Sequence, residues 1–142
     1  MRKYLSLLLV FLMCACQNGS GRYGDDTPED LDFNIGDCVL FDVNSARLDS
    51  QAQSALTRQA SWLNNNADIK IIIEGHCDER GTREYNLALG AKRASAVKDY
   101  LIASGIDPSR ISTISYGKER PPVPGTGPDV WKENRRAITR IN

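Results

Sequence analysis

One stretch of the sequence restricts the fold more than any other. It begins with an almost unbroken apolar segment, Ile69 to Cys77, and continues through a polar loop into a long segment with helical character. A short apolar run without polar alternation is typical of a strand that is buried on both faces of a sheet. The segment is therefore predicted to be a central strand.

The segment after the loop carries the signals of a helix from about Arg83 to Ser104. Thr82 can cap its first turn, and Gly105 is suited to end it. The apolar positions expected on one side of this helix recur at helical spacing, and they are Leu87, Ala91, Ala94, Val97 and Leu101. The sequence therefore predicts a strand, a loop and a long helix in succession.

The rest of the domain follows the same kind of pattern. Asp49 or Ser50 is expected to cap a first helix over about Gln51–Asn64, and "VWKEN" is expected to form a short helical turn. Further strands are predicted at Cys38–Val43, Ile111–Gly117 and Arg135–Ile141. The predicted order is β-α-β-α-β-β. This is an α+β fold with a mixed four-stranded sheet and two main helices on one face.

The N-terminus has the pattern of an export signal. A basic start, Met1 to Lys3, precedes the apolar run Tyr4 to Met13, which is shorter than the about 20 residues that span a bilayer. Small Ala15 precedes Cys16, whereas bulky Met13 precedes Cys14. The pattern resembles the lipobox of bacterial lipoproteins, with Cys16 as the lipidated residue. The alternative is an ordinary cleaved signal in which Cys16 has no role.

Three parts of the chain are predicted. Residues 1–15 form the lipoprotein signal peptide, residues 16–32 the lipidated N-terminus and a flexible tether, and residues 33–142 one folded domain. The formal charge of the chain is zero, so no basic excess indicates nucleic acid as a partner. By resemblance to Gram-negative lipoproteins, Gln17 after the cysteine favours the outer membrane, with the domain facing the periplasm.

The row His76-Cys77-Asp78-Glu79 ends the predicted central strand and raises three interpretations. Consecutive strand residues point to opposite faces, so the four side chains do not converge on one metal ion, and no metal or other cofactor is expected. A cysteine nucleophile would need His76 as its base, but His76 points away from Cys77 on a continuing strand. Cys77 is then a small buried residue, or it forms a disulfide with Cys38 in an oxidising periplasm.

A binding pocket accounts for more of this region. Glycines on both sides of the row let the backbone bend and a ligand approach. The following helix presents Asn86, Leu89, Gly90 and Arg93 along one side. Asp78 and Arg93 then face one cavity with opposite charges, and the alternative is a purely structural salt bridge between them.

Long motifs add a family resemblance. The segment "EGHCDERGTREYNLALGAKRASAVKDYL" (Glu74–Leu101) resembles the signature of the OmpA-like peptidoglycan-binding domain, and more narrowly that of the peptidoglycan-associated lipoproteins, or Pal. The segments "LFDVNSARL", "SYGKERP" and "ENRRA" agree with it.

The resemblance implies which residues bind. Diaminopimelate of the peptidoglycan stem peptide would give its ammonium to Asp78 and its carboxylate to Arg93, and Asn86 would add a hydrogen bond. The wall of the pocket would be made by Phe41, Asp42, Leu89 and Gly90, with Arg136 as a support. Alanine in place of Asp78 or Arg93 is expected to leave the fold intact and to abolish retention on peptidoglycan.

The resemblance also implies a function without catalysis, namely that of a lipid-anchored protein that holds the outer membrane to the cell wall. Its further partner would be TolB of the Tol complex, which links the protein to envelope integrity and cell division. Two other interpretations remain. One is a different OmpA-like wall anchor of a secretion or motility machine, and the other is a wall hydrolase that uses His76 and Cys77.

Overall fold

The computed structural model describes residues 36–142 as one α+β domain. The predicted signal peptide, Cys16 and the tether lie outside this range. In chain order the elements are β1 (Cys38–Leu40), α2 (Ser50–Asn65), β2 (Ile71–His76), α3 (Arg83–Ala103), the 3-10 turn η2 (Pro108–Arg110), β3 (Ile111–Gly117), α4 (Pro128–Asn134) and β4 (Arg136–Ile141). Within residues 36–142, the helices are too short or too polar to cross a membrane.

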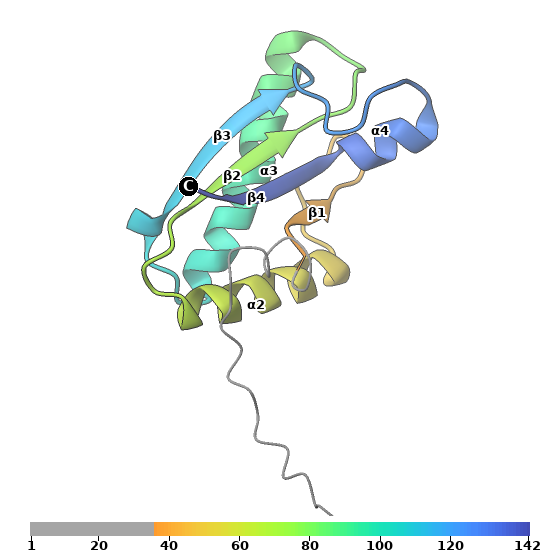
Figure 1. The fold of residues 1–142 in the computed structure, drawn as a ribbon. Coiled ribbons are helices and arrows are strands. Elements are labelled where there is room, and N and C mark those ends of the chain that lie inside the picture. The colour runs from red at the N-terminus through yellow and green to blue at the C-terminus, as the bar shows by residue number, and fades with distance from the viewer. Residues whose placement is uncertain (1–35) are drawn as a thin grey trace, which may run out of the picture.

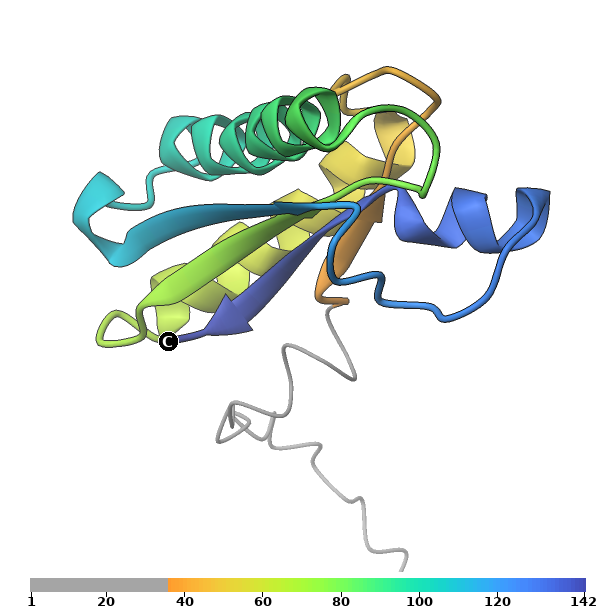
Figure 2. The same ribbon diagram turned by 90° about the horizontal axis from the view of Figure 1, so that it is seen from above.

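The four strands form one mixed sheet in the order β1-β4-β2-β3. Strand β2 runs parallel to β3 and antiparallel to β4, and β1 pairs antiparallel with β4. Helices α2 and α3 both cover the same face of the sheet (Figures 1 and 2). The predicted fold class, with two main helices on one face of a mixed sheet, is therefore confirmed.

Strand β2 is central, as its apolar run predicted. It has a hydrogen-bonded neighbour on each side, and five of its six residues are buried. The core between the sheet and the helices is made mainly of aliphatic side chains, including Val39, Leu56, Leu63, Ile71, Ile73, Val97 and Leu101. Both predicted caps form. Asp49 accepts a 2.7 Å hydrogen bond from the N–H of Ala52, and Thr82 accepts one of 3.2 Å from the N–H of Tyr85.

The first strand is shorter than predicted, because it ends at Leu40 rather than Val43. The carbonyl of Asp42 accepts a 3.0 Å hydrogen bond from the guanidinium of Arg93 instead of a bond from a neighbouring strand. The buried cation on α3 therefore holds the loop that follows β1. The short turn expected near "VWKEN" is the seven-residue helix α4, which has Pro128 in its first turn.

Helix α3 packs unusually close to β2. A Cβ atom added to Gly75 would overlap the backbone carbonyl of Gly90, and one added to Gly90 would overlap the hydroxyl of Ser115. The two glycines therefore allow strand and helix backbones to touch. This close approach fixes the start of α3 beside the end of β2, where the predicted site lies.

Candidate functional site

A pocket lies where β2 ends, its loop turns, and α3 begins. Its volume is about 210 Å³, and it opens to solvent. Four charged side chains line it, and these are Asp78, Arg80, Arg93 and Arg135. The lining of the pocket therefore contains one carboxylate and three guanidinium groups. The lining is electropositive, and Asp78 is its single anionic group.

Asp78 is only 7% exposed and accepts several hydrogen bonds. Arg80 donates to it from its backbone N–H at 3.0 Å, from Nε at 3.2 Å and from Nη2 at 2.8 Å, and Arg135 donates from Nη1 at 3.4 Å. Burial by itself would raise the pKa of the Asp78 carboxyl, but the hydrogen bonds and charge of Arg80, with Arg135, outweigh it and lower this pKa. Asp78 is an anion at neutral pH.

Arg93 is fully buried, and its side chain is held by three backbone carbonyls. Nε donates to Ser45 at 2.8 Å, Nη1 to His76 at 2.8 Å and Nη2 to Asp42 at 3.0 Å. Burial lowers the pKa of this guanidinium. Three of its five N–H groups are thus used inside the protein. Arg93 joins α3 to the end of β2 and to the loop after β1, a structural role that the sequence did not predict.

Asp78 and Arg93 line one pocket without pairing with each other. The salt bridges of Asp78 are made with Arg80 and Arg135 among the described residues. The sequence left open a structural pair between Asp78 and Arg93, and the structure does not form it. The two residues are brought together as predicted, but each already has partners.

The other predicted residues divide into two groups. Asn86 and Leu89 line the pocket, and the Asn86 amide also donates to the carbonyls of Arg80 at 2.8 Å and Thr82 at 3.0 Å. The remaining three, Phe41, Asp42 and Gly90, lie outside the lining. Phe41 is buried, and its ring centroid lies 5.2 Å from the Arg93 guanidinium carbon. Asp42 meets Arg93 only through its carbonyl, and Gly90 packs on Gly75.

Sequence reasoning missed two arginines of the pocket, Arg80 and Arg135. It named Arg136 as the support, but Arg136 lies in β4 opposite Leu40, and its side chain belongs to the sheet face away from the helices. The neighbouring Arg135 instead donates from Nε to the carbonyl of Phe41 at 3.0 Å and reaches Asp78. Alternation along a strand places adjacent residues on opposite faces. Arg136 was predicted from the family resemblance and not from this alternation, and β4 begins at Arg136, one residue later than predicted.

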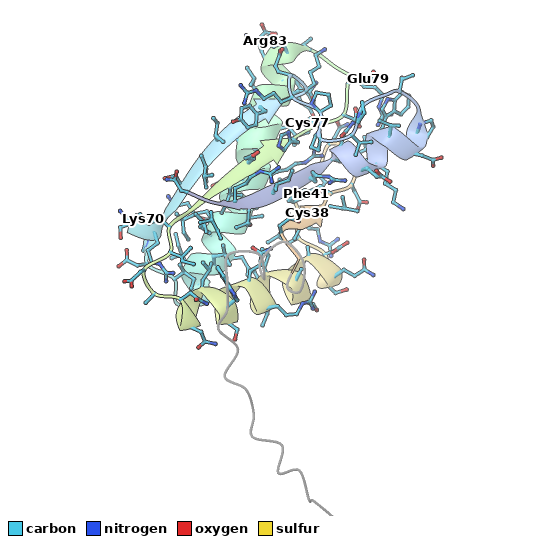
Figure 3. All side chains as sticks on the ribbon, viewed as in Figure 1. Cys38, Phe41, Lys70, Cys77, Glu79 and Arg83 are labelled. Carbon is cyan, nitrogen blue, oxygen red and sulfur yellow. The ribbon has the colours of Figure 1, made fainter. Side chains whose placement is uncertain are left out.

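Cys77 and His76 are separated by the sheet. The Cys77 thiol lines the pocket and donates to the carbonyl of Asn86 at 3.3 Å, and burial raises its pKa. His76 lies in a second pocket with Glu74 and Tyr116. The thiol therefore has no imidazole base beside it. Cys38 and Cys77 are both free, on β1 and beyond the end of β2 (Figure 3). In residues 36–142 no three potential ligands gather as a metal site.

Comparison with known proteins assigns the family. The OmpA family matches residues 40–135. The peptidoglycan-associated lipoprotein of Mesorhizobium japonicum is 49% identical over 88% of this chain and 74% of its own length. That of Pasteurella multocida is 35% identical over 97% of this chain and 98% of its own.

Solved structures agree. The crystal structure of the peptidoglycan-associated lipoprotein from Burkholderia pseudomallei has a TM-score of 0.76 and 36% identity, and it covers 82% of this chain and 100% of that one. The C-terminal domain of Helicobacter pylori MotB, at 23% identity, has a TM-score of 0.69 over 75% of this chain and 84% of that one, and shares the fold alone. The chain therefore belongs to the OmpA family, and within it to the peptidoglycan-associated lipoproteins.

Proposed function

We propose that this protein anchors the outer membrane to peptidoglycan without catalysis, by binding the diaminopimelate of a stem peptide in the pocket beside Asp78. The single observation that carries the proposal is a pocket with one buried acid and three arginines at the end of β2. The side chain of diaminopimelate ends in an ammonium and a carboxylate. Asp78 can accept hydrogen bonds from the ammonium, and the electropositive lining can donate hydrogen bonds to the carboxylate.

The burial of the site determines how tightly such a ligand binds. A hydrogen bond to a charged group contributes roughly 1.5–3 kcal/mol when partly desolvated, and two or three of them correspond to affinities in the micromolar range. Many anchored copies on one polymeric wall would then hold firmly through avidity. Asp78 is expected to contribute most, because it is the acceptor among the four charged lining residues.

Co-sedimentation of the full-length protein, in detergent, with purified sacculi tests the proposal. We expect Asp78→Asn and Arg135→Met to lower the sedimented fraction at least tenfold. Arg136→Met is the matched control, because it removes the same charge from the neighbouring residue on the other face of the sheet, and we expect it to sediment normally. Normal retention of the Asp78→Asn protein would refute the proposal. Release of soluble wall fragments would favour the hydrolase instead.

The membrane attachment is a separate part of the proposal. Cys16 would carry the lipid, and several acyl chains contribute about 0.8 kcal/mol per buried CH₂, enough for stable anchoring. We expect a Cys16→Ser protein to leave the outer-membrane fraction for the soluble periplasmic fraction and to lose incorporation of labelled palmitate. Unchanged fractionation would assign the lipid to Cys14 or remove it from the proposal.

The family resemblance adds TolB as a second partner, at a surface that overlaps the wall-binding pocket. If the surfaces overlap, a diaminopimelate-containing muropeptide will displace TolB from this protein. A pull-down of TolB at increasing muropeptide concentration measures this competition. Simultaneous binding of both would contradict the overlap without affecting the anchoring proposal.

A further inference from the structure

The carboxylate of Asp78 has no free position for a ligand. A carboxylate offers about four lone-pair sites. Oδ1 accepts from the backbone N–H and Nε of Arg80, and Oδ2 accepts from Nη2 of Arg80 and Nη1 of Arg135. An incoming ammonium must therefore replace one of these donors.

The two arginines differ in how easily they can leave. The Arg135 side chain is 13% exposed and is anchored by its second bond, from Nε to the Phe41 carbonyl. The Arg80 side chain is 43% exposed, and its hydrogen bonds within the described residues all go to Asp78. Arg80 is thus the donor that a ligand can replace with the least disturbance.

A fixed aromatic surface lies beside Arg80. Its guanidinium carbon is 4.2 Å from the ring centroid of Trp131 in α4. The indole is held in turn, because its Nε1 donates to Glu79 at 2.7 Å and Thr126 donates to the same carboxylate oxygen. Figure 3 shows Glu79 in the loop beside α4. A guanidinium that leaves Asp78 can keep its cation–π contact with this ring.

We propose that Arg80 is a movable cap on Asp78, which occupies the position of the ligand ammonium and makes the pocket selective for a zwitterion. The proposal rests on the proposed function. A lysine side chain offers only an ammonium, so it must break the Asp78–Arg80 pair and leaves Arg80 without a carboxylate. Diaminopimelate offers a carboxylate next to its ammonium, and the released Arg80 pairs with it. Arg80 thereby determines specificity by penalising the ligand that lacks the acid.

The test is a titration of the full-length protein in detergent with two stem peptides that differ only in diaminopimelate or lysine. We expect Arg80→Met to bind the lysine peptide about three- to tenfold more tightly than the wild type does, because the competing cation is gone. Its affinity for the diaminopimelate peptide changes less or falls, so the preference between the two peptides shrinks. Methionine keeps a long side chain on Trp131.

Arg83→Met is the matched control. Arg83 is an exposed residue three positions further on, and it pairs with Glu119 at 2.9 Å rather than with Asp78. The variant loses the same charge, and we expect its affinity for both peptides to equal that of the wild type. Circular dichroism of each variant confirms that the fold is intact.

The outcomes separate the cap from the proposed function. Tighter binding of the lysine peptide by Arg80→Met supports the cap. An unchanged or weaker affinity for that peptide overturns it and leaves Arg80 as an ordinary ligand contact or a bystander. A wild-type protein that binds neither peptide overturns the proposed function, and the cap with it.

Discussion

The end of β2 separates two pockets that satisfy their polar groups in opposite ways. On the helix side, Asp78 and Arg93 are each held by three or more hydrogen bonds. On the open side, His76 is 3% exposed, and neither of its ring nitrogens has a hydrogen-bond partner among the described residues. The two pockets have the same volume, about 210 Å³.

The two sides differ in hydrogen bonding because one buries charged groups and the other buries a neutral imidazole. A buried charge is tolerated only with partners. The helix side supplies Arg93 with carbonyls from the loop after β1 and from the end of β2, and it supplies Asp78 with donors from Arg80 and Arg135. A neutral imidazole is tolerated with fewer partners, because its burial costs less than that of an ion. Glu74 lies 3.7 Å from the His76 ring, too far for a hydrogen bond. The buried Arg93 on the helix side is therefore expected to be held rigidly, and the open side is expected to respond to pH.

The largest effect is expected from Arg93→Ala. The substitution leaves three carbonyls without their charged donor and opens a cavity, so we expect the free energy of unfolding to fall by about 3–5 kcal/mol. This corrects the expectation that the variant keeps an intact fold, because that expectation placed Arg93 free in the pocket. Urea unfolding of the unlipidated Cys16→Ser chain measures the loss. Arg136→Ala, on the open side, is the control and should change stability by less than about 1 kcal/mol.

An equal loss in both of these variants would break the comparison, because it would mean that the two sides of the strand depend equally on their cations. A small loss in Arg93→Ala alone would mean that the three carbonyls find other partners.

A somewhat smaller effect is expected at the contact between β2 and α3. Gly75→Ala drives a methyl group into the backbone of Gly90. We expect the free energy of unfolding to fall by about 3 kcal/mol or more. The methyl group of Gly90→Ala would contact the Ser115 hydroxyl first. Alanine also gains about 1 kcal/mol of helix propensity over glycine, so we expect a smaller loss of stability for this variant. Urea unfolding compares the two variants.

The second substitution Ser115→Ala sharpens this prediction. It should recover part of the stability of Gly90→Ala, since it removes the hydroxyl, and recover none for Gly75→Ala, where backbone is in the way. Recovery in both would show that the strand and helix can move apart.

The smallest effect is a pH dependence from the open side. Burial lowers the pKa of His76 more than Glu74 raises it, and Arg136 lowers it further, with Arg120 and Arg140 also lining this pocket. The unfolded chain therefore binds a proton at a higher pH than the folded chain does. The free energy of unfolding falls as the pH drops below about 6.5, where an ordinary histidine titrates.

His76 is the single histidine of the chain, so the measurement is direct. Urea unfolding at pH 7.5 and 5.5 should show lower stability at the acidic pH, and His76→Gln should remove most of this difference. A wild-type protein that becomes more stable on acidification would contradict the prediction, since it would require Glu74 to dominate.

The sequence by itself determined the elements and their order. The length of the apolar run marked β2 as central, and apolar residues at helical spacing defined α2 and α3. Short polar side chains marked both helix caps. Each of these patterns is local in the chain, because it follows from backbone geometry. The alternation rule also placed His76 and Cys77 on opposite sides. The grouping of Asp78, Asn86, Leu89 and Arg93 around one pocket followed from a strand, a loop and a helix that are contiguous in the chain.

Only the tertiary structure decided which partners the charges have. Arg135 reaches Asp78 from 57 positions away, and Arg93 reaches Asp42 from 51 positions away, so neither contact leaves a local pattern. Hydrogen bonds between distant segments depend on how the sheet and helices pack. For this reason the sequence predicted a pocket with two opposite charges, whereas the folded chain pairs its one acid with two arginines and buries a third arginine of the same pocket completely.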